Sequence, residues 1–237
     1  MKKYTSLIPI LFLIFSFISI SALSQIKKDD DLFTRATKSF FQKNFDMAEH
    51  LLKEVIQKDP QNALAYSYLG DIYLNKKQYD GALNLYLKAV EIDPAPAENY
   101  FRMGQIHYFR KHGALSIENY DKALARDSKL HIVYYHKGLA YLMLMRDKNN
   151  TISNWERFIT LAPEDPQYDS IKRIIALLKD PDFKIPDAGS EVSIEEALLL
   201  GGATLSRQER AAEDKKAGHE TKKSVHELEE IYKEDDL

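Results

Sequence analysis

The strongest constraint on the fold of this chain is a column of small residues that recurs every 34 positions. Gly70, Gly104 and Gly138 stand 34 residues apart, and Ala36 extends the column one step towards the N-terminus. A period of this length is typical of a solenoid, in which repeated supersecondary units stack on their neighbours. Since such an array offers extended surface rather than an enclosed pocket, the spacing favours a binding function over catalysis.

Each repeating unit contains two runs of apolar residues at helical spacing. In the first run, Tyr66, Gly70 and Tyr73 are separated by four and three positions, which places them on one helix face. The dipeptide Asp-Pro stands between units at 59–60 and at 93–94, and proline disfavours helical geometry in the residue before it. The pattern therefore predicts two antiparallel helices per unit, separated from the next pair by a short link.

The columns shift by one residue in the last unit. Beyond Met145, the residues Thr151, Trp155 and Pro163 continue the columns only if one additional position is allowed. We therefore expect the fourth unit to hold one extra residue in the turn between its two helices. The small column is expected to be structural, because small residues in one helix let the large residues of its neighbour approach closely.

This pattern resembles the tetratricopeptide repeat, a helix–turn–helix family with a 34-residue period. The resemblance implies an all-α, right-handed superhelical solenoid of four units. It rests on a nearly complete set of family positions in the second unit: Tyr66, Leu69, Gly70, Tyr73, Ala82, Tyr86, Ala89 and Pro94. The expected units are 29–62, 63–96, 97–130 and 131–165, which together form a repeat domain over 29–165.

In this family the first helix of each unit lines a concave groove, and the resemblance implies a partner-binding face at the same positions. Most of these positions are apolar here, and aromatic residues and Met are favoured in the cores of interfaces. Apolar stripes at helical spacing are more often core, so the alternative that single residues pack between neighbouring first helices stays open. The candidate groove residues are Phe33, Phe40, Phe41, Leu64, Asp71, Leu74, Asn75, Phe101, Gln105, Tyr108, Phe109, Tyr135, Leu139, Leu142 and Met143.

The first 24 residues have the composition of a secretory signal peptide. Lys2 and Lys3 precede an apolar run, and small residues stand after it at Ala22 and Ser24. The apolar run is short for a membrane span, which takes about 20 residues, so cleavage after Ser24 is favoured over an uncleaved membrane anchor. Residues 25–28 are then a short linker, and the mature protein is expected to be periplasmic or secreted in a bacterium.

After the repeats, residues 166–180 are predicted to form one amphipathic helix that caps the solenoid. The remainder, 181–237, is interpreted as a largely flexible acidic tail with short helices, because residues 180–237 carry sixteen acidic and eight basic side chains. Ser193 and Glu196 resemble a capping box that opens one such helix. The apolar residues within 194–200 can lie in the groove of their own chain or of a second copy.

The sequence favours an adaptor that holds a protein or peptide in the bacterial cell envelope; the alternative is a noncatalytic subunit of an envelope enzyme, transporter or secretion complex. No enzyme activity or cofactor is predicted, since the chain has no cysteine and no phosphate-binding glycine loop. His131 and His136 are five residues apart, a spacing that does not align on one helix face, and no metal site is predicted. The absence of a basic stripe argues against nucleic acid.

Overall fold

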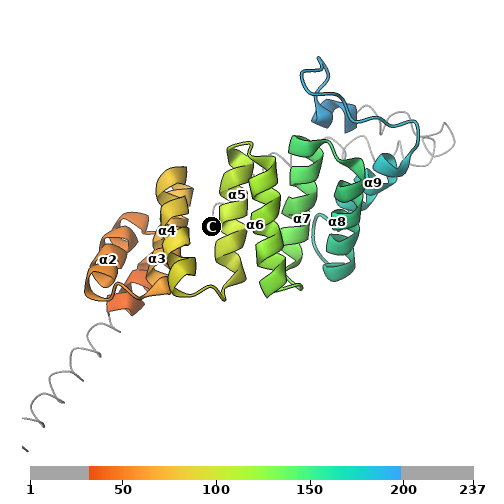
Figure 1. Cartoon of the computed structure of the whole chain (residues 1–237). Helices are drawn as coiled ribbons and strands as arrows, with labels where there is room; N and C mark the ends of the chain where they lie inside the picture. Colours follow the sequence, from red (N-terminus) through yellow and green to blue (C-terminus); the bar gives the residue numbers. More distant parts are fainter. Residues whose placement is uncertain (1–31, 199–237) are drawn as a thin grey trace, which may run out of the picture. The chain divides into compact units, whose positions relative to one another are not determined.

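The computed structural model describes residues 32–198, and every regular element in that range is helical (Figure 1). The all-α class is therefore confirmed. The predicted signal peptide 1–24, the linker 25–28 and the tail beyond Leu198 lie outside the described residues. None of the helices in the described part of the chain combines the length and apolar character that a membrane-spanning helix needs.

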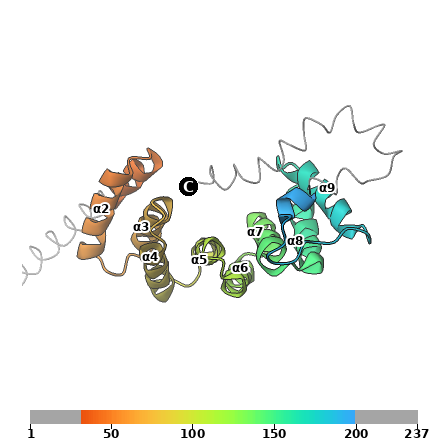
Figure 2. The same cartoon turned by 90° about the horizontal axis from the view of Figure 1, so that it is seen from above.

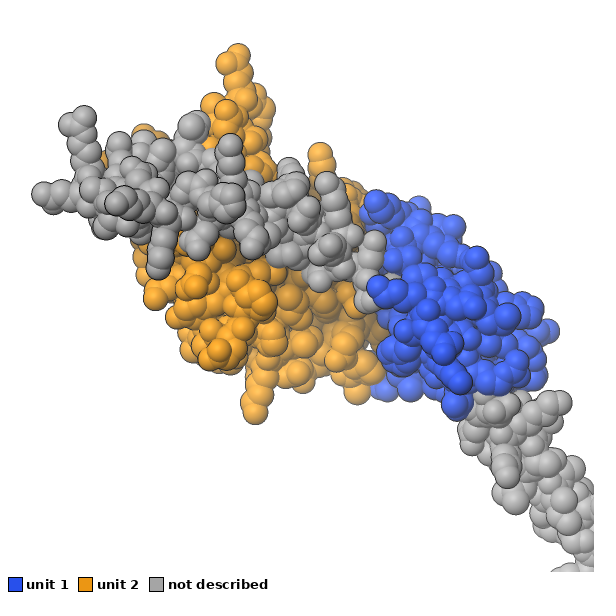
Figure 3. Space-filling view, turned by 180° about the vertical axis from the view of Figure 1, so that it is seen from behind, with its two compact units in different colours: residues 1–94 blue, residues 95–237 orange. Residues whose placement is uncertain are grey.

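The described residues fall into two compact units, coloured separately in Figure 3. Unit 1 ends at Pro94 and unit 2 begins at Ala95. Unit 1 contains a helical stretch at 32–41, then α2 (Phe45–Lys58), α3 (Ala63–Asn75) and α4 (Tyr79–Ile92). Unit 2 contains α5 (Ala97–Phe109), α6 (Gly113–Arg126), α7 (His131–Ala140), the π-helical turn η1 (Tyr141–Met145), α8 (Lys148–Leu161), α9 (Tyr168–Lys179) and a helical stretch at 194–198.

The helices pair as hairpins within each unit, as Figure 2 shows from above. In unit 1, α3 packs on α4 and on α2; in unit 2, α5 packs on α6 and α7 on α8. The second helices end where the sequence places Asp-Pro: Asp59 and Asp93 are the C-cap residues of α2 and α4. α9 lies within the range 166–180 expected for the capping helix and packs on α8.

The small-residue column lets the two helices of a hairpin approach closely. A Cβ atom added at Gly104 would lie 2.4 Å from the Tyr120 ring, and one added at Gly138 would lie 2.4 Å from the Trp155 ring. Both distances are far below ordinary van der Waals contact. The large aromatic residue of the second helix therefore fills the space that the missing side chain leaves, as the sequence predicts.

The turn inside each hairpin has the same backbone geometry at four places. Lys43, Lys77, Lys111 and Arg146 all have positive φ angles, of 57°, 56°, 59° and 54°. At Lys77 the turn closes as a Schellman motif, in which Gln78 N–H donates to Tyr73 O and Lys77 N–H donates to Leu74 O. A non-glycine residue in this left-handed region carries a conformational cost. Each turn therefore keeps its basic residue in a backbone conformation that this residue type disfavours.

The extra residue of the fourth hairpin is located in its first helix, which corrects the expectation that it lies in the turn. Arg146 precedes the start of α8 by two residues, as Lys111 precedes the start of α6, so the turn has not lengthened. The chain instead widens into η1, and Asp147 N–H donates to Tyr141 O across six residues. A π-helical turn absorbs one additional residue without breaking the helix, because each hydrogen bond spans one more position.

Candidate partner-binding site

Unit 1 carries a cluster of aromatic rings, formed by Phe33, Phe40, Phe41, Phe45 and Tyr68. Phe40 is central: its ring centroid lies 5.0 Å from that of Tyr68, 5.5 Å from Phe41 and 5.8 Å from Phe45, with edge-to-face geometry in each pair. Phe33 and Phe41 also contact Tyr68, at 6.1 and 6.0 Å. Edge-to-face aromatic pairs stabilise beyond their burial alone, so the aromatic cluster is a preformed apolar surface.

The outer edge of the aromatic cluster is open to solvent. Phe40, at the base of the cluster, is 9% exposed, whereas Phe41 is 71% exposed. Leu64 is 53% exposed and stands four residues before Tyr68 in α3, which places both side chains on one face of the helix. Large exposed apolar side chains gathered at one place are typical of an interaction site.

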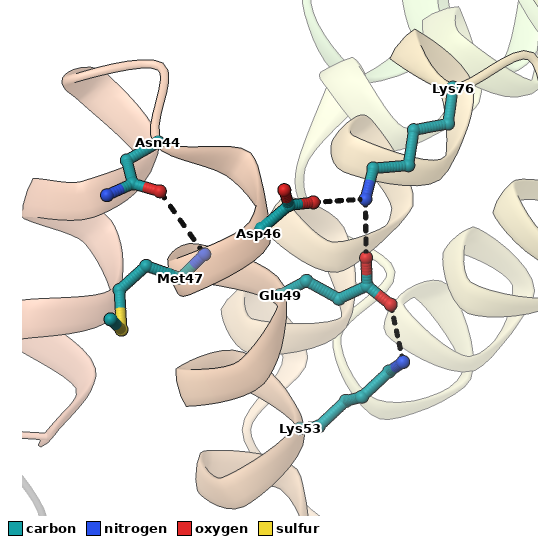
Figure 4. Close-up of polar contacts among 6 residues, drawn as sticks. All are labelled: Asn44, Asp46, Met47, Glu49, Lys53 and Lys76. Carbon is teal, nitrogen blue, oxygen red and sulfur yellow. Dashed lines mark hydrogen bonds and ion pairs between the residues drawn. The ribbon is translucent and has the colours of Figure 1, made fainter.

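Ion pairs also join α2 to α3 (Figure 4). Lys76, the C-cap residue of α3, donates to Asp46 Oδ1 and to Glu49 Oε2, each at 2.9 Å, and Lys53 donates to Glu49 Oε1. The hydrogen bonds from Lys53 and Lys76 hold the pKa of Glu49 below its ordinary value. These contacts join α2, which supplies Phe45, to α3, which supplies Tyr68.

Six of the candidate groove residues are buried, so the expectation that packing leaves them open is wrong for these positions. The structural alternative, packing between neighbouring helices, applies to them instead. The buried residues are Phe40, Phe101, Gln105, Tyr135, Leu139 and Leu142. Among the others, Asp71, Leu74, Asn75, Tyr108 and Met143 are half-buried, and Phe109 is 36% exposed.

The burial of Phe101 has a specific cause in unit 2. Its ring centroid lies 5.1 Å from that of His136 and 5.9 Å from that of Tyr120. The Tyr135 ring also packs against His136, at 5.2 Å. Burial, with Arg102 as a smaller cause, lowers the pKa of His136 to about 3. His136 is thus a neutral core residue.

Asp71 also has a structural contact, because it accepts a hydrogen bond from the Tyr86 hydroxyl at 2.5 Å. This bond joins α3 to α4 inside a hairpin. Among residues 32–198, no group of three or more His, Asp or Glu side chains is placed to hold a metal ion.

Two members of the aromatic cluster were not among the predicted groove residues. Tyr68 lies on α3, one residue beyond the position that the family uses, and Phe45 is the first residue of α2. A signal for Tyr68 was present, since Leu64 and Tyr68 are four residues apart. No comparable signal marks Phe45, whose place depends on the turn at Lys43.

Known proteins share both the repeat sequence and the fold of this chain. Residues 42–104 match the family profile described as tetratricopeptide repeat. A comparison with curated protein sequences found no match. Among solved structures, the chain is similar to the MamA protein, with a TM-score of 0.57 and 21% identity over 81% of this chain and 95% of that one.

Two further solved structures have the same fold. The chain is similar to the MamA fragment 41-end from Desulfovibrio magneticus RS-1, with a TM-score of 0.58 and 19% identity over 65% of this chain and 86% of that one. It is also similar to a mutant of the O-GlcNAc transferase from Thermobaculum terrenum, with a TM-score of 0.52 and 19% identity over 56% of this chain and 26% of that one. At these identities the likeness shows the fold alone.

Proposed function

Because this chain is a tetratricopeptide repeat protein, we propose that it is an interaction scaffold of the bacterial cell envelope. In this proposal the aromatic cluster of unit 1 binds an apolar peptide segment of a partner protein. The fold is generally a noncatalytic interaction scaffold, since it presents surface along a stack of helix pairs. The proposal therefore assigns recognition to this chain and leaves any chemistry to its partner.

The observation that carries the proposal is the contrast between Phe40 and Phe41. Phe40 is nearly buried and anchors the rings around it, while the neighbouring Phe41 ring is 71% exposed. An exposed aromatic ring on a rigid aromatic base loses little conformational freedom when a partner covers it. This is the arrangement that suits an energetically dominant contact in an interface.

The expected partner segment is apolar and helical or extended. Phe41, Leu64 and Tyr68 present rings and an aliphatic side chain to solvent, with no carboxylate or guanidinium among them. Such a surface matches aliphatic or aromatic anchors that recur on one face of a peptide. The partner's charged residues are then expected at the edge of the interface, where they remain in water.

The envelope location rests on the sequence of the first 24 residues. Their charged start, apolar run and small residues before Gln25 support export followed by cleavage. Sequencing the N-terminus of the protein isolated from the cells that produce it tests this part. A chain that begins at Gln25 supports the proposal, and a chain that retains Met1 in the cytoplasm contradicts it.

The binding site is tested by photo-crosslinking in intact cells. A photoreactive phenylalanine analogue replaces Phe41, and in a matched control it replaces Leu87, which is 49% exposed on α4 of the same unit. We expect a discrete adduct from position 41 and none of the same mass from position 87. The crosslinked peptide, identified by mass spectrometry, should carry apolar residues three or four positions apart. The same adducts from both positions would refute the site.

A further inference from the structure

The chain turns back onto unit 2 after α9. We call residues 180–198 the strap. Lys148 Nζ donates to the main-chain oxygens of Asp180, at 2.9 Å, and Phe183, at 3.0 Å. Arg146 Nε donates to the main-chain oxygen of Pro186 at 3.0 Å. Arg146 is the C-cap residue of η1 and Lys148 is the first residue of α8, so these bonds hold the main chain of the first part of the strap. The side chains of Phe183 and Ile185 also pack against the apolar cluster of unit 2.

The middle of the strap is exposed and contains a hinge. Residues 187–193 are all exposed. Gly189 has φ of +82°, and an added Cβ would meet no atom within 4 Å. Glycine adopts this backbone conformation at little cost, and the open surroundings leave it free to change. This stretch therefore connects the two held ends of the strap without packing of its own.

The end of the strap is a short helix that contributes two anchors to the core of unit 2. Ser193 Oγ accepts from Glu196 N–H at 3.0 Å, as the predicted capping box requires, and residues 194–198 are helical. Ile194 and Leu198, one helical turn apart, are 5% and 6% exposed. The described residues 194–198 form little more than one helical turn, which is not stable alone in water, so this turn depends on the surface that receives it.

The receiving surface includes predicted groove positions. The apolar cluster that contains Ile194 and Leu198 also contains Tyr135, Leu139 and Leu142 of α7 and η1, together with side chains of α8 and α9. In Figures 1 and 2 the blue end of the strap lies beside α7 and α8 in both views. Three residues that sequence reasoning assigned to a ligand thus share one apolar cluster with a helix from the same chain.

We propose that unit 2 carries a helix-binding site, and that the strap occupies it in cis until a partner helix displaces it. Three observations support displacement over permanent packing. Arg146 and Lys148 bind main-chain oxygens, which any peptide can offer. In the described part of the helical end, residues 194–198, two side chains are buried, Ile194 and Leu198. The segment before it is exposed and hinged at Gly189.

The strap itself indicates the chemistry of the partner. Its helix presents aliphatic side chains at positions i and i+4, has a hydroxyl residue as N-cap, and carries Glu195 and Glu196 in its first turn. Acidic residues are favoured there because the helix dipole is positive at its N-terminus. A partner helix with two aliphatic anchors and an acidic first turn therefore fits the site. This site is separate from the aromatic cluster of unit 1, so either proposal can fail alone.

A competition experiment on the full chain tests the proposal. The probe is a fluorescein-labelled peptide of residues 188–200. The double variant Ile194→Ser/Leu198→Ser is the form of the protein in which the strap is expected to leave the site. The matched control is Val192→Ser, which changes an exposed apolar residue of the same strap. When the strap occupies the site, the apparent affinity for the probe is reduced in proportion to the fraction of molecules whose site is open. We therefore expect the double variant to bind the probe about tenfold more tightly than the wild type or the control.

The probe has its own control, a peptide with the same two serine substitutions, which should bind no protein. Equal probe affinity for the wild type and the double variant overturns the proposal. Absence of binding to a double variant that retains its far-ultraviolet circular dichroism also overturns it. Both results would show that the strap is a fixed part of the core.

If the double variant fails to fold, a second experiment on the wild-type strap tests the same proposal. A site-specific protease sequence inserted at Gly189 allows the folded wild-type chain to be cut in the exposed segment. We expect the fragment beyond the cut to exchange with the labelled probe and to separate from the rest on gel filtration. A fragment that stays bound in excess probe refutes displacement.

Discussion

The two units use the same repeat positions differently. Phe33 in unit 1 and Tyr135 in unit 2 stand three periods apart in one column. Phe33 is half-buried at the side of an aromatic cluster whose outer ring, Phe41, is 71% exposed, whereas Tyr135 is fully buried. The repeat pattern places the residue on the same helix face in both units, so the column alone does not decide whether that face is open.

The second helix of its own hairpin covers part of Tyr135, since the Phe158 ring lies 5.5 Å away and Trp155 Nε1–H donates to Tyr135 O. Segments that come after the repeats join the same apolar cluster. In unit 2, α9 and the strap add Ile171, Ile175, Ile194 and Leu198 to the apolar cluster that contains Tyr135. Burial of these side chains stabilises unit 2 and removes the same surface from solvent. The candidate binding surface of a repeat protein is therefore set by its flanking segments as well as by its repeats.

The largest expected contrast is between Tyr135→Ala and Phe33→Ala. Removing a fully buried aromatic ring leaves a cavity, and we expect the free energy of unfolding of unit 2 to fall by about 3–5 kcal/mol. The half-buried Phe33 has fewer contacts to lose, and we expect about 1 kcal/mol in unit 1. Native-state amide hydrogen exchange measures both, because it reports α7 and α2 separately. Equal losses would show that the two faces are equally covered.

The second contrast is in pH dependence, and it depends on His136. The folded pKa of about 3 lies below the ordinary 6.5, so the folded state requires the neutral ring. Stability from this group is complete above about pH 6.5 and falls as the pH drops towards 3, by up to about 1.4 kcal/mol per pH unit.

Hydrogen exchange of α7 between pH 6.5 and 4.5 tests this contrast. After correction for intrinsic exchange, protection in α7 should fall more steeply than in α3, which has no histidine. The variant His136→Leu should lose the excess slope, since it removes the titrating group and preserves an apolar side chain. A slope unchanged by the substitution would contradict the assignment to His136.

The sequence predicted the repeat and its internal packing, because both depend on residues at a fixed short spacing. Gly104 and Gly138 were expected to admit a large neighbour, and Tyr120 and Trp155 occupy those places. The addition of Ile194 and Leu198 to the apolar cluster of unit 2 could not be predicted from the repeat alone, since both residues lie beyond the last unit and obey no period. The capping pattern at Ser193 nevertheless identified the helix that provides them.

The location of the extra residue in the fourth hairpin also could not be predicted from the sequence. One additional position between Gly138 and the start of α8 can be taken up by the helix or by the turn. The four left-handed residues, Arg146 among them, keep one turn geometry, so η1 widens instead. The choice depends on the relative cost of two backbone conformations, which residue spacing does not report.

The third prediction concerns the hydrogen bonds that hold the strap on unit 2. Lys148→Ala removes two hydrogen bonds from a charged donor, and we expect residues 194–198 to open about 1.5–2 kcal/mol more easily. The Ala197 amide, which donates to Ser193 O, should then exchange about 10- to 30-fold faster. Lys129→Ala, at an exposed lysine of the same unit, should leave this exchange unchanged. No change in Lys148→Ala would show that the apolar anchors hold the strap alone.

The smallest contrast compares the same turn position in the two units. Lys77→Gly relieves the strain of a left-handed backbone in the folded state, but glycine also loses more conformational entropy on folding. We therefore expect the free energy of unfolding of unit 1 to rise by a net of about 0.5–1 kcal/mol. Arg146→Gly relieves the same strain but loses the bond to Pro186 O, worth about 1 kcal/mol, so the two effects should nearly cancel in unit 2. Exchange in α3 and in α7 measures the pair. If both variants gain equally, Arg146 contributes nothing to the strap, and the hold that distinguishes unit 2 rests on Lys148 and the apolar anchors.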